Sequence, residues 1–150
     1  MEFQVRDARI TDVDGITTLL EMSGVVDGVP DGAVDLLRRM LYLPHAALLV
    51  AESNRRVVGF GVLVLSSSIR RGGTVGTIDL LVVDRGPMEQ SVADALLAEM
   101  VRSARRKGCV VVEAAAPEGT MEQHRWEEQG FDSTRPRLEL ALGRVRAGRP

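Results

Sequence analysis

The sequence predicts one mixed α/β (α+β) domain built around a single sheet. Apolar segments of strand and helix length follow one another in the order strand, two helices, three strands, helix, strand, helix, strand. Three strands in a row favour antiparallel pairing, and the strand that follows the next helix favours parallel pairing. With 150 residues, of which 45% are hydrophobic, the chain is long enough to bury one core.

The first third of the chain predicts a strand and two helices. Residues 2–8 alternate apolar and polar side chains, which is typical of a strand. Thr11 and Asp12 are candidate N-caps of a first helix, because their side-chain oxygens can accept from free backbone N–H groups. Residues 33–43 carry apolar side chains at helical spacing and are followed by Pro44, which cannot continue a helix.

The middle of the chain predicts three antiparallel strands. Residues 45–52 and 56–66 are joined at Ser53 and Asn54, and asparagine tolerates the positive φ that a tight hairpin turn requires. Residues 75–83 form the third strand of this group. These strands supply most of the predicted sheet.

The remaining elements alternate between helix and strand. Residues 88–107 repeat apolar side chains every three or four positions, as an amphipathic helix does. Residues 110–116 are apolar on both faces, which predicts a central strand parallel to its neighbour. Cys109, beside it, is either a buried strand thiol or a nucleophile. Residues 120–129 predict a short helix and residues 137–142 the final strand.

Composition excludes several function classes. The formal net charge of −2 disfavours a nucleic-acid partner, because phosphate binding requires a basic face. No apolar run approaches the roughly 20 residues of a membrane span, and the polar start is not a signal peptide. We therefore expect a cytoplasmic protein that binds neither nucleic acid nor membrane. The single cysteine excludes an internal disulfide and a CxxC metal site, and no metal ligand set is expected.

The segment from Thr77 to Leu97 predicts an anion-binding site. An apolar strand passes through a tight polar turn directly into an amphipathic helix. The start of a helix leaves backbone N–H groups without intrahelical partners and carries the positive end of the helix dipole. Ser91 and Ala93 keep the first turn small. A phosphate group can therefore bind there with little help from side chains.

The same segment resembles the acyl-CoA-binding motif of the GNAT acyltransferases, in which V-x-P-x-x-R-x-x-G-x-G/A joins a strand to a helix. It matches at Val83, at Ala93 and at the pair Leu96-Leu97 that follows. The segment WEEQGF, which ends at Phe131, is similar to the family's Y-x-x-x-G-F signature. The opening VRDARITDVDGI is similar to the family's R-x-A-x-x-x-D start.

The order of the predicted elements is also that of the GNAT family, over about residues 3–142. The resemblance therefore implies the GNAT acyl-CoA N-acyltransferase fold, with a mixed sheet of six to seven strands and four helices. It implies one domain over residues 1–143, and the remaining residues 144–150 have no periodic apolar content and predict a disordered tail.

The motif departs from the family pattern at four positions. Arg85 replaces the usual proline, Met88 replaces arginine or glutamine, and Ser91 replaces the first glycine. Glu89 stands where a small or basic residue is common. These changes weaken an anion site without removing its backbone donors, and the alternative is an ordinary strand-to-helix turn that binds nothing.

The resemblance implies that acetyl-CoA lies where the fourth and fifth strands part. The main chain of the fourth strand would contact the pantetheine arm, and the amides at the start of the following helix would bind the pyrophosphate. The positions that the resemblance assigns to this site are Leu81, Val82, Val83, Met88, Glu89, Gln90, Ser91, Val92 and Ala93.

Two carboxylates are candidates for catalysis. Asp79 stands where many family members carry a glutamate base, and being one methylene shorter it would act through water. Its alternative role is to pair with an arginine or to cap a loop. Glu113 is a second candidate, and its alternative role is that of a solvated or paired edge residue. Both lie beside apolar residues, where burial would raise the pKa of a carboxyl group.

The family's tyrosine acid is replaced by Trp126, whose indole N–H cannot deliver a proton to sulfur. We expect this change to slow catalysis rather than abolish it, because water, Ser91 or His124 can take part in its place. Trp126 itself is predicted to pack in the core, with a position beside the pantetheine as the alternative.

The acceptor site is expected at the loop between the first two helices and at the end of the third strand. The candidate residues are Asp27, Asp31, Tyr42 and Ser67. Residues 21–35 hold four acidic side chains and neither lysine nor arginine, which favours a cationic small amine or amino sugar. The alternative is an acidic loop that is only solvated.

The sequence thus predicts an N-acetyltransferase that moves an acetyl group from acetyl-CoA to a primary amine of a small molecule, by direct attack in a ternary complex. The alternative is a catalytically silent domain of the same fold that binds a ligand or a partner protein. Many members of the family form dimers, so a homodimer is an expectation by analogy.

Overall fold

The computed structural model describes residues 2–23, 29, 31–115, 120–133 and 137–142. In chain order the elements are β1 (Gln4–Asp7), the 3-10 turn η1 (Ile10–Asp12), α1 (Val13–Ser23), α2 (Ala33–Met40), β2 (Ala46–Ser53), β3 (Arg56–Ser68), β4 (Gly73–Val83), α3 (Glu89–Arg106), β5 (Cys109–Ala114) and α4 (Thr120–Glu128). The predicted fold class and nearly all predicted elements are confirmed.

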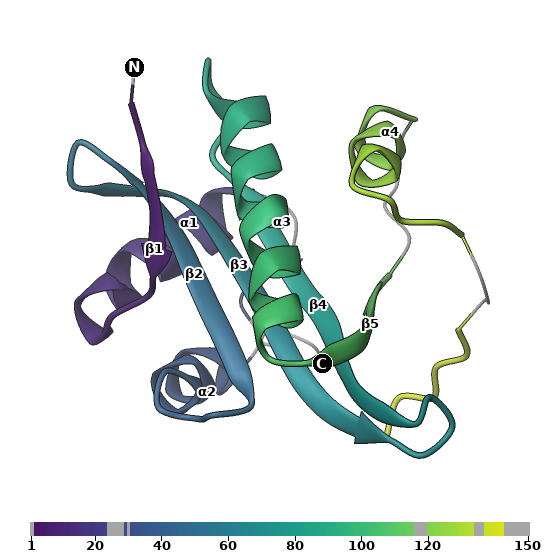
Figure 1. Ribbon diagram of the computed structural model, residues 1–150. Coiled ribbons are helices and arrows are strands. Elements are labelled where there is room, and N and C mark those ends of the chain that lie inside the picture. Colours follow the sequence, from purple (N-terminus) through teal and green to yellow (C-terminus); the bar gives the residue numbers. More distant parts are fainter. Residues whose placement is uncertain (1, 24–28, 30, 116–119, 134–136, 143–150) are drawn as a thin grey trace.

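The described strands form one sheet in the order β1-β2-β3-β4-β5 (Figure 1). The first four strands pair antiparallel, and β5 pairs with β4 in parallel. The hairpin between β2 and β3 turns at Asn54 and Arg55, with φ values of 51° and 63°. The turn therefore lies one residue later than the sequence predicts, because Ser53 still pairs with Arg56.

Helices cover both faces of the sheet (Figure 1). On one face, α1 and α2 bury Ile16 and Leu37 against Phe60 and Val82. On the other face, α3 and α4 form a second core that includes the fully buried Met100. Among the helices within the described ranges, none is both long and apolar enough to cross a lipid bilayer.

Glycines on β3 bring α3 close to the sheet. A Cβ atom at Gly59 would lie 2.7 Å from both Leu96 Cδ1 and Val92 Cγ1. Since real Cβ atoms do not approach other heavy atoms so closely, the start of α3 requires glycine at this position. The packing fixes where the first turn of α3 lies relative to β4.

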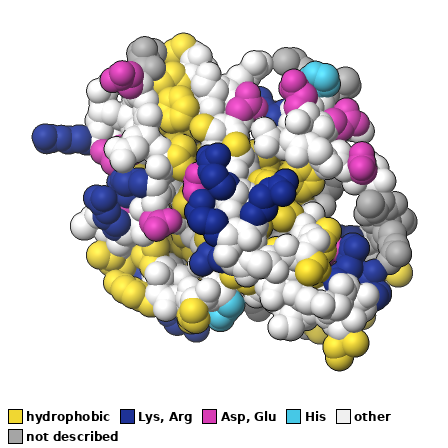
Figure 2. Space-filling model, in the orientation of Figure 1, with side chains coloured by type: hydrophobic (Ala, Val, Ile, Leu, Met, Phe, Trp, Pro, Cys, Tyr) yellow, Lys and Arg dark blue, Asp and Glu magenta, His cyan; other side chains and the backbone are white. Residues whose placement is uncertain are grey.

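The exposed side of α3 carries a group of basic side chains (Figure 2). Glu99 accepts from Arg102 and from Arg106, at 2.8 and 3.0 Å. Exposed pairs of this kind contribute little to stability, typically below about 1 kcal/mol.

A partly buried ion network joins β1, β2 and the 3-10 turn before α1. The Arg6 guanidinium donates to both carboxylate oxygens of Asp12, at 2.8 and 2.9 Å, and to Glu52 at 2.9 Å. Asp12 also accepts from the Arg9 N–H at 2.7 Å. Thus Asp12 does not cap α1 directly: it closes the preceding 3-10 turn, and α1 begins at Val13.

Two predictions about the sheet are wrong. Residues 137–142 form no strand, and their leucine side chains are almost fully exposed, so the described sheet has five strands instead of six to seven. Within that sheet β5 is an edge strand and not a central one. The apolar pattern of β5 arises because Val112 and Ala114 pack on the core while Val110 is 58% exposed. The predicted tail at residues 144–150 lies outside the described residues.

We predict that Asp12→Ala lowers the free energy of unfolding by about 3 kcal/mol, because it leaves Arg6, whose side chain is only 14% exposed, with one carboxylate partner. Urea denaturation at pH 7 measures this loss. The control is Asp35→Ala, which removes an exposed pair with Arg38 and should change stability by less than about 0.5 kcal/mol. Equal effects of the two substitutions would contradict the assignment.

The same network predicts a pH dependence. The hydrogen bond from the Arg6 guanidinium holds the pKa of the Asp12 carboxyl below its usual range, against the opposing effect of burial. The contribution of the ionised Asp12 carboxylate to the stability of the fold is therefore complete above the ordinary carboxyl pKa of about 3.9. It is lost as the pH falls through the lowered pKa of Asp12. As the pH falls from neutral to strongly acidic, the free energy of unfolding should decrease more in the wild-type protein than in Asp12→Ala.

Candidate functional site

The parallel pairing of β4 with β5 covers only the first part of β4. Five residue pairs connect the two strands, from Thr74 with Cys109 to Ile78 with Ala114. Beyond that point β4 continues to Val83 while still paired with β3. The second half of β4 therefore has no strand on its other side among the described residues, and its backbone groups there are free to bind a ligand.

Asp79 lies where this second half begins. On β3, Leu63 pairs with Ile78 and Val62 pairs with Leu80, so the register slips and Asp79 has no partner. A bulge of this kind re-aims the side chains that follow it. The Asp79 side chain is exposed, and no ion pair to it is found in the described part of the chain. Among the described residues no arginine pairs with Asp79, so the alternative role of pairing with an arginine finds no support there.

The start of α3 follows β4 after a short turn. Asp84 holds this turn, donating its N–H to Val58 O at 2.8 Å and accepting from Arg56 at 2.7 Å. The Glu89 N–H donates to Gly86 O, and the Val92 N–H donates to Met88 O. Within the described ranges no backbone acceptor is found for the N–H groups of Gln90 and Ser91. These two amides are the free donors that the strand-to-helix pattern predicts.

The predicted cofactor positions divide into three groups by exposure. Val82, Val92 and Ala93 have side chains buried in the two cores, so these side chains cannot contact a ligand. Leu81, Val83 and Met88 are half-buried on the α3 side of the sheet. Glu89, Gln90 and Ser91 are exposed. Exposure of Glu89 leaves its carboxylate free to point into solvent, away from a bound anion.

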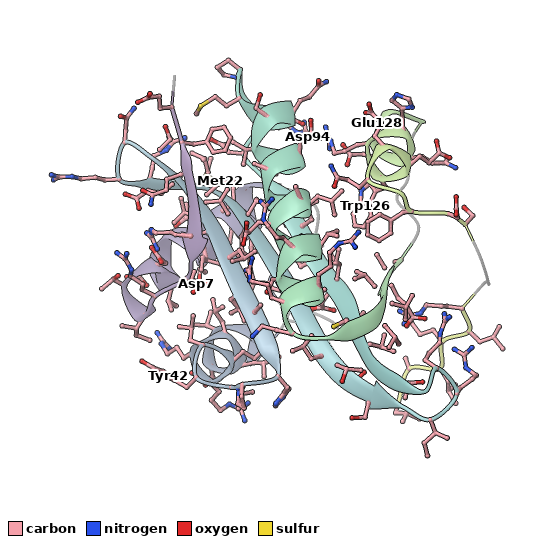
Figure 3. The ribbon with its side chains drawn as sticks, viewed as in Figure 1. Asp7, Met22, Tyr42, Asp94, Trp126 and Glu128 are labelled. Atoms are coloured by element: carbon pink, nitrogen blue, oxygen red, sulfur yellow. The ribbon has the colours of Figure 1, made fainter. Side chains whose placement is uncertain are left out.

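An ion pair connects α4 to α3, and no local sequence pattern predicts it. Arg125 has a side chain only 11% exposed, and its Nε lies 3.0 Å from Oδ1 of Asp94 on α3, with which it forms an ion pair. Figure 3 shows Asp94 on the side of α3 that faces α4. Trp126 is 8% exposed and meets the ring of Phe131 edge to face, with centroids 5.0 Å apart. Trp126 is therefore a core residue, as predicted.

Of the remaining catalytic candidates, Glu113 is held in an ion pair and His124 is exposed. Glu113 accepts from Arg71 at 2.9 Å, which is the paired edge role considered for it. Glu113 lies opposite Thr77 and so two residues before Asp79 in the register of the sheet. His124 is exposed and lies 3.7 Å from Glu128 on the same helix.

The structure does not bring the predicted acceptor residues together. Asp31 precedes α2 and Tyr42 follows it, so the length of the helix, about 12 Å, separates them. Ser67 pairs with Thr74, which lies five residues before Asp79, or about 16 Å along β4. Asp27 lies outside the described residues. Asp31, Tyr42 and Ser67 are all exposed.

Cys109 begins β5 and is half-buried next to α3. Burial raises the pKa of its thiol, and the nearby charge of Lys107 opposes this effect only in part. A thiol with a raised pKa is a poor nucleophile at neutral pH, so the structure favours the buried-thiol interpretation.

Known proteins share this architecture. The chain matches the model of the acetyltransferase (GNAT) family over residues 17–131. A transcriptional regulator from Bacillus halodurans C-125 superposes with a TM-score of 0.80 at 17% identity, covering 94% of this chain and 100% of that one. Glucosamine-6-phosphate N-acetyltransferase from Arabidopsis thaliana gives 0.78 at 18% identity, covering 95% and 100%.

A third solved structure is AAC(6′)-Iy in complex with the bisubstrate analogue CoA-S-monomethyl-acetylneamine, with a TM-score of 0.78 at 20% identity, covering 95% of this chain and 99% of that one. At these identities the superpositions show a shared fold and nothing finer. A search among curated proteins finds no match.

We predict that Cys109 is alkylated by iodoacetamide several-fold more slowly in the native protein than in urea at the same pH, because burial disfavours its thiolate. Mass spectrometry of timed samples measures the rate, and the rate in the native protein should rise as the pH is increased. Faster reaction in the native protein than in urea would show an activated nucleophile instead.

Proposed function

Because the chain belongs to the GNAT acetyltransferase family, we propose that it transfers an acetyl group from acetyl-CoA to a primary amine of a small molecule. The observation that carries this proposal is the parting of β4 from β5 after Ile78, with Asp79 and the free amides of α3 beyond that point. This arrangement places a carboxylate, an apolar strand and free backbone donors one after another along β4 and the start of α3.

In this proposal the pyrophosphate of acetyl-CoA binds the N–H groups of Gln90 and Ser91. These amides have no other acceptor in the described structure and lie at the positive end of an 18-residue helix. The pantetheine arm lies along Leu81 and Val83, which pair with β3 but have no strand on their other side among the described residues. Since these contacts use the main chain, they tolerate the motif's departures at Met88 and Ser91.

Glu89 weakens this site without excluding the ligand. A carboxylate roughly 6 Å from a phosphate charge costs about 0.7 kcal/mol in water and about 3 kcal/mol at an effective dielectric near 20. The exposure of Glu89 favours the lower value. Micromolar affinity corresponds to about 8 kcal/mol, so the repulsion lowers affinity but leaves binding possible.

The reaction is direct transfer. The neutral amine nitrogen attacks the thioester carbonyl carbon, a C–N bond forms, and the C–S bond then breaks to release the CoA thiolate. Asp79, exposed on the bulge, first takes one proton from the cationic amine through a bridging water. The second proton, which the nitrogen loses when the C–N bond forms, passes through water to the leaving sulfur. Glu113 stays with Arg71 and acts as an ion-pair partner of the sheet edge.

The thiolate leaves without a protein acid in this mechanism. Trp126 occupies the position of the family's tyrosine but is packed against Phe131 and the core, so water protonates the sulfur. An alkyl thiol with a pKa near 8.5 is a tolerable leaving group as the thiolate. We therefore propose slow turnover compared with relatives that keep the tyrosine.

The proposed acceptor is a cationic amine such as an amino sugar. Two of the solved structures with this fold are named for such substrates, namely a glucosamine-6-phosphate acetyltransferase and an aminoglycoside acetyltransferase. In this chain the acidic residues before α2, among them the exposed Asp31, favour a positive charge.

Titration of the protein with acetyl-CoA by isothermal calorimetry tests the first step. We expect saturable binding at micromolar to millimolar ligand, weaker at high salt because the phosphate contacts are electrostatic. Absence of heat at millimolar acetyl-CoA would exclude the enzyme and leave the catalytically silent domain as the remaining function.

We predict that Asp79→Asn lowers kcat by about 10²- to 10⁴-fold and leaves acetyl-CoA affinity unchanged, because the side chain acts only as a base. Release of the CoA thiol over a panel of amines measures the rate. The matched control is Asp7→Asn, an exposed aspartate on β1, which should keep the wild-type rate. A rate unchanged in Asp79→Asn would remove Asp79 from the mechanism.

We predict that Met88→Arg raises the affinity for acetyl-CoA by about threefold to tenfold at low salt, since it adds an attractive charge beside the start of α3. Calorimetry at two salt concentrations measures the gain, which should shrink as salt increases. Gln4→Arg, an equal change of charge on the exposed edge of β1, is the control. Equal gains in both variants would point to nonspecific attraction.

A further inference from the structure

A hollow of about 690 Å³, which we call the β5 hollow, lies along β5 and away from the path proposed for acetyl-CoA. All six residues of β5 line it, together with parts of the turn between β3 and β4, of α3 and of the segment after α4. On α3 its wall includes Arg105, which lies about 21 Å along the helix from Ser91. The β5 hollow is therefore separate from the free amides at the start of α3, and its volume is that of a small-molecule site.

Positive charge gathers in the β5 hollow, although the whole chain has a formal net charge of −2. The arginines in its lining come from three parts of the fold, namely the turn between β3 and β4, the end of α3 and the segment after α4. They are Arg70, Arg71, Arg105 and Arg137, against the two carboxylates of Glu113 and Asp132. Arginines that meet in one hollow raise the local concentration of anions, so this lining favours an anionic ligand.

Arg71 has a donor for which the described structure supplies no acceptor. Its Nη2 donates to Glu113 at 2.9 Å, but its Nε is buried and unpaired there. Buried polar atoms in folded proteins nearly always have a hydrogen-bond partner, and a buried donor without one indicates a place for a bound ion or water. A carboxylate or phosphate group can accept from a guanidinium through two oxygens at once. Beside three further arginines, the missing partner of Arg71 is best supplied by an anion.

The rest of the lining is largely apolar. Val110 and Val112 of β5, Ala104 of α3 and Phe131 all contribute to it, and Val110 is 58% exposed. Figure 2 shows basic and hydrophobic side chains together at the corner of the molecule where the turn between β3 and β4 lies. Apolar walls with a few polar groups at one place are typical of sites for small organic ligands, in which the polar groups fix the orientation.

We propose that the β5 hollow binds an amphipathic anion, that is, a small molecule with an apolar body and one carboxylate or phosphate group. The anionic group accepts from the guanidinium of Arg71, while Arg70 and Arg105 attract it from the turn between β3 and β4 and from α3. The apolar body lies along β5 and contacts Val110 and Phe131. Binding covers this apolar surface and gives the buried donor of Arg71 its acceptor.

Titration with octanoate, followed by nuclear magnetic resonance, tests the proposal. We expect saturable binding below about 1 mM, with the largest shifts at the backbone amides of residues 109–114 and at the Nε–H of Arg71. Octanol lacks the charge and acetate lacks the apolar body, so each should bind about tenfold more weakly or less. Octyl phosphate, compared with octanoate, identifies the anionic group that the site prefers. Equal binding of octanol, or saturation without shifts at these positions, would overturn the proposal.

A pair of charge variants provides the second measurement. Arg70→Gln with Arg105→Gln should weaken octanoate binding by about tenfold, because two attractive charges leave the hollow. The matched control, Arg38→Gln with Arg39→Gln, removes the same charge from α2 and should keep the native affinity. All four side chains are exposed, so circular dichroism of both variants should match the native protein. Equal losses in the two variants would show nonspecific attraction and contradict a site in the hollow.

The proposal stands apart from acetyl-CoA binding, and the same titration separates the two. Octanoate should bind with unchanged affinity when acetyl-CoA is saturating, and it should not shift the amides of Gln90 and Ser91. A protein that binds octanoate but not acetyl-CoA would contradict the proposed function and support this site, and the reverse result would do the opposite. Competition between the two ligands would place octanoate in the cofactor path and overturn a separate site.

Discussion

The structure depends on the two different partners of β4. Along β3 the strand is paired from Gly73 to Val83, whereas along β5 the pairing stops at Ile78. Pairing with β3 holds the second half of β4 in place, while the end of the pairing with β5 leaves backbone groups on its other side without a strand partner among the described residues. The bulge at Asp79 comes at the same point, so a carboxylate marks the place where the strands part.

Packing around β4 keeps this arrangement in place. Gly59 lets the start of α3 lie close against β3, and the pair of Asp94 with Arg125 holds α4 next to α3. The partly buried network of Arg6 and Asp12 stabilises the opposite edge of the sheet and does not reach β4. The family match at residues 17–131 covers all of the elements from α2 to α4 and most of α1.

Local patterns in the sequence predict most of the helices and strands, but they do not predict which strands pair with each other. Periodicity predicts α3 and the strands around it because each buries one face on the core. Periodicity gave wrong predictions for two segments: residues 110–116 were expected at the centre of the sheet, and residues 137–142 were expected to form a strand. An apolar pattern indicates that a segment has a face to bury, but it does not indicate which strand the segment pairs with. Ion pairs such as Arg71 with Glu113 join residues 42 positions apart, and no local pattern predicts them. The resemblance to the family predicts that Asp79 and the start of α3 belong to the site. The structure identifies the backbone amides there that have no acceptor among the described residues.

A nuclear magnetic resonance titration with acetyl-CoA tests the central claim, that the ligand binds where β4 leaves β5. The account predicts that the largest chemical-shift changes occur at the backbone amides of Gln90 and Ser91 and along residues 81–83. Saturation of the protein with no change at these amides, or with the largest changes on β1, would contradict it.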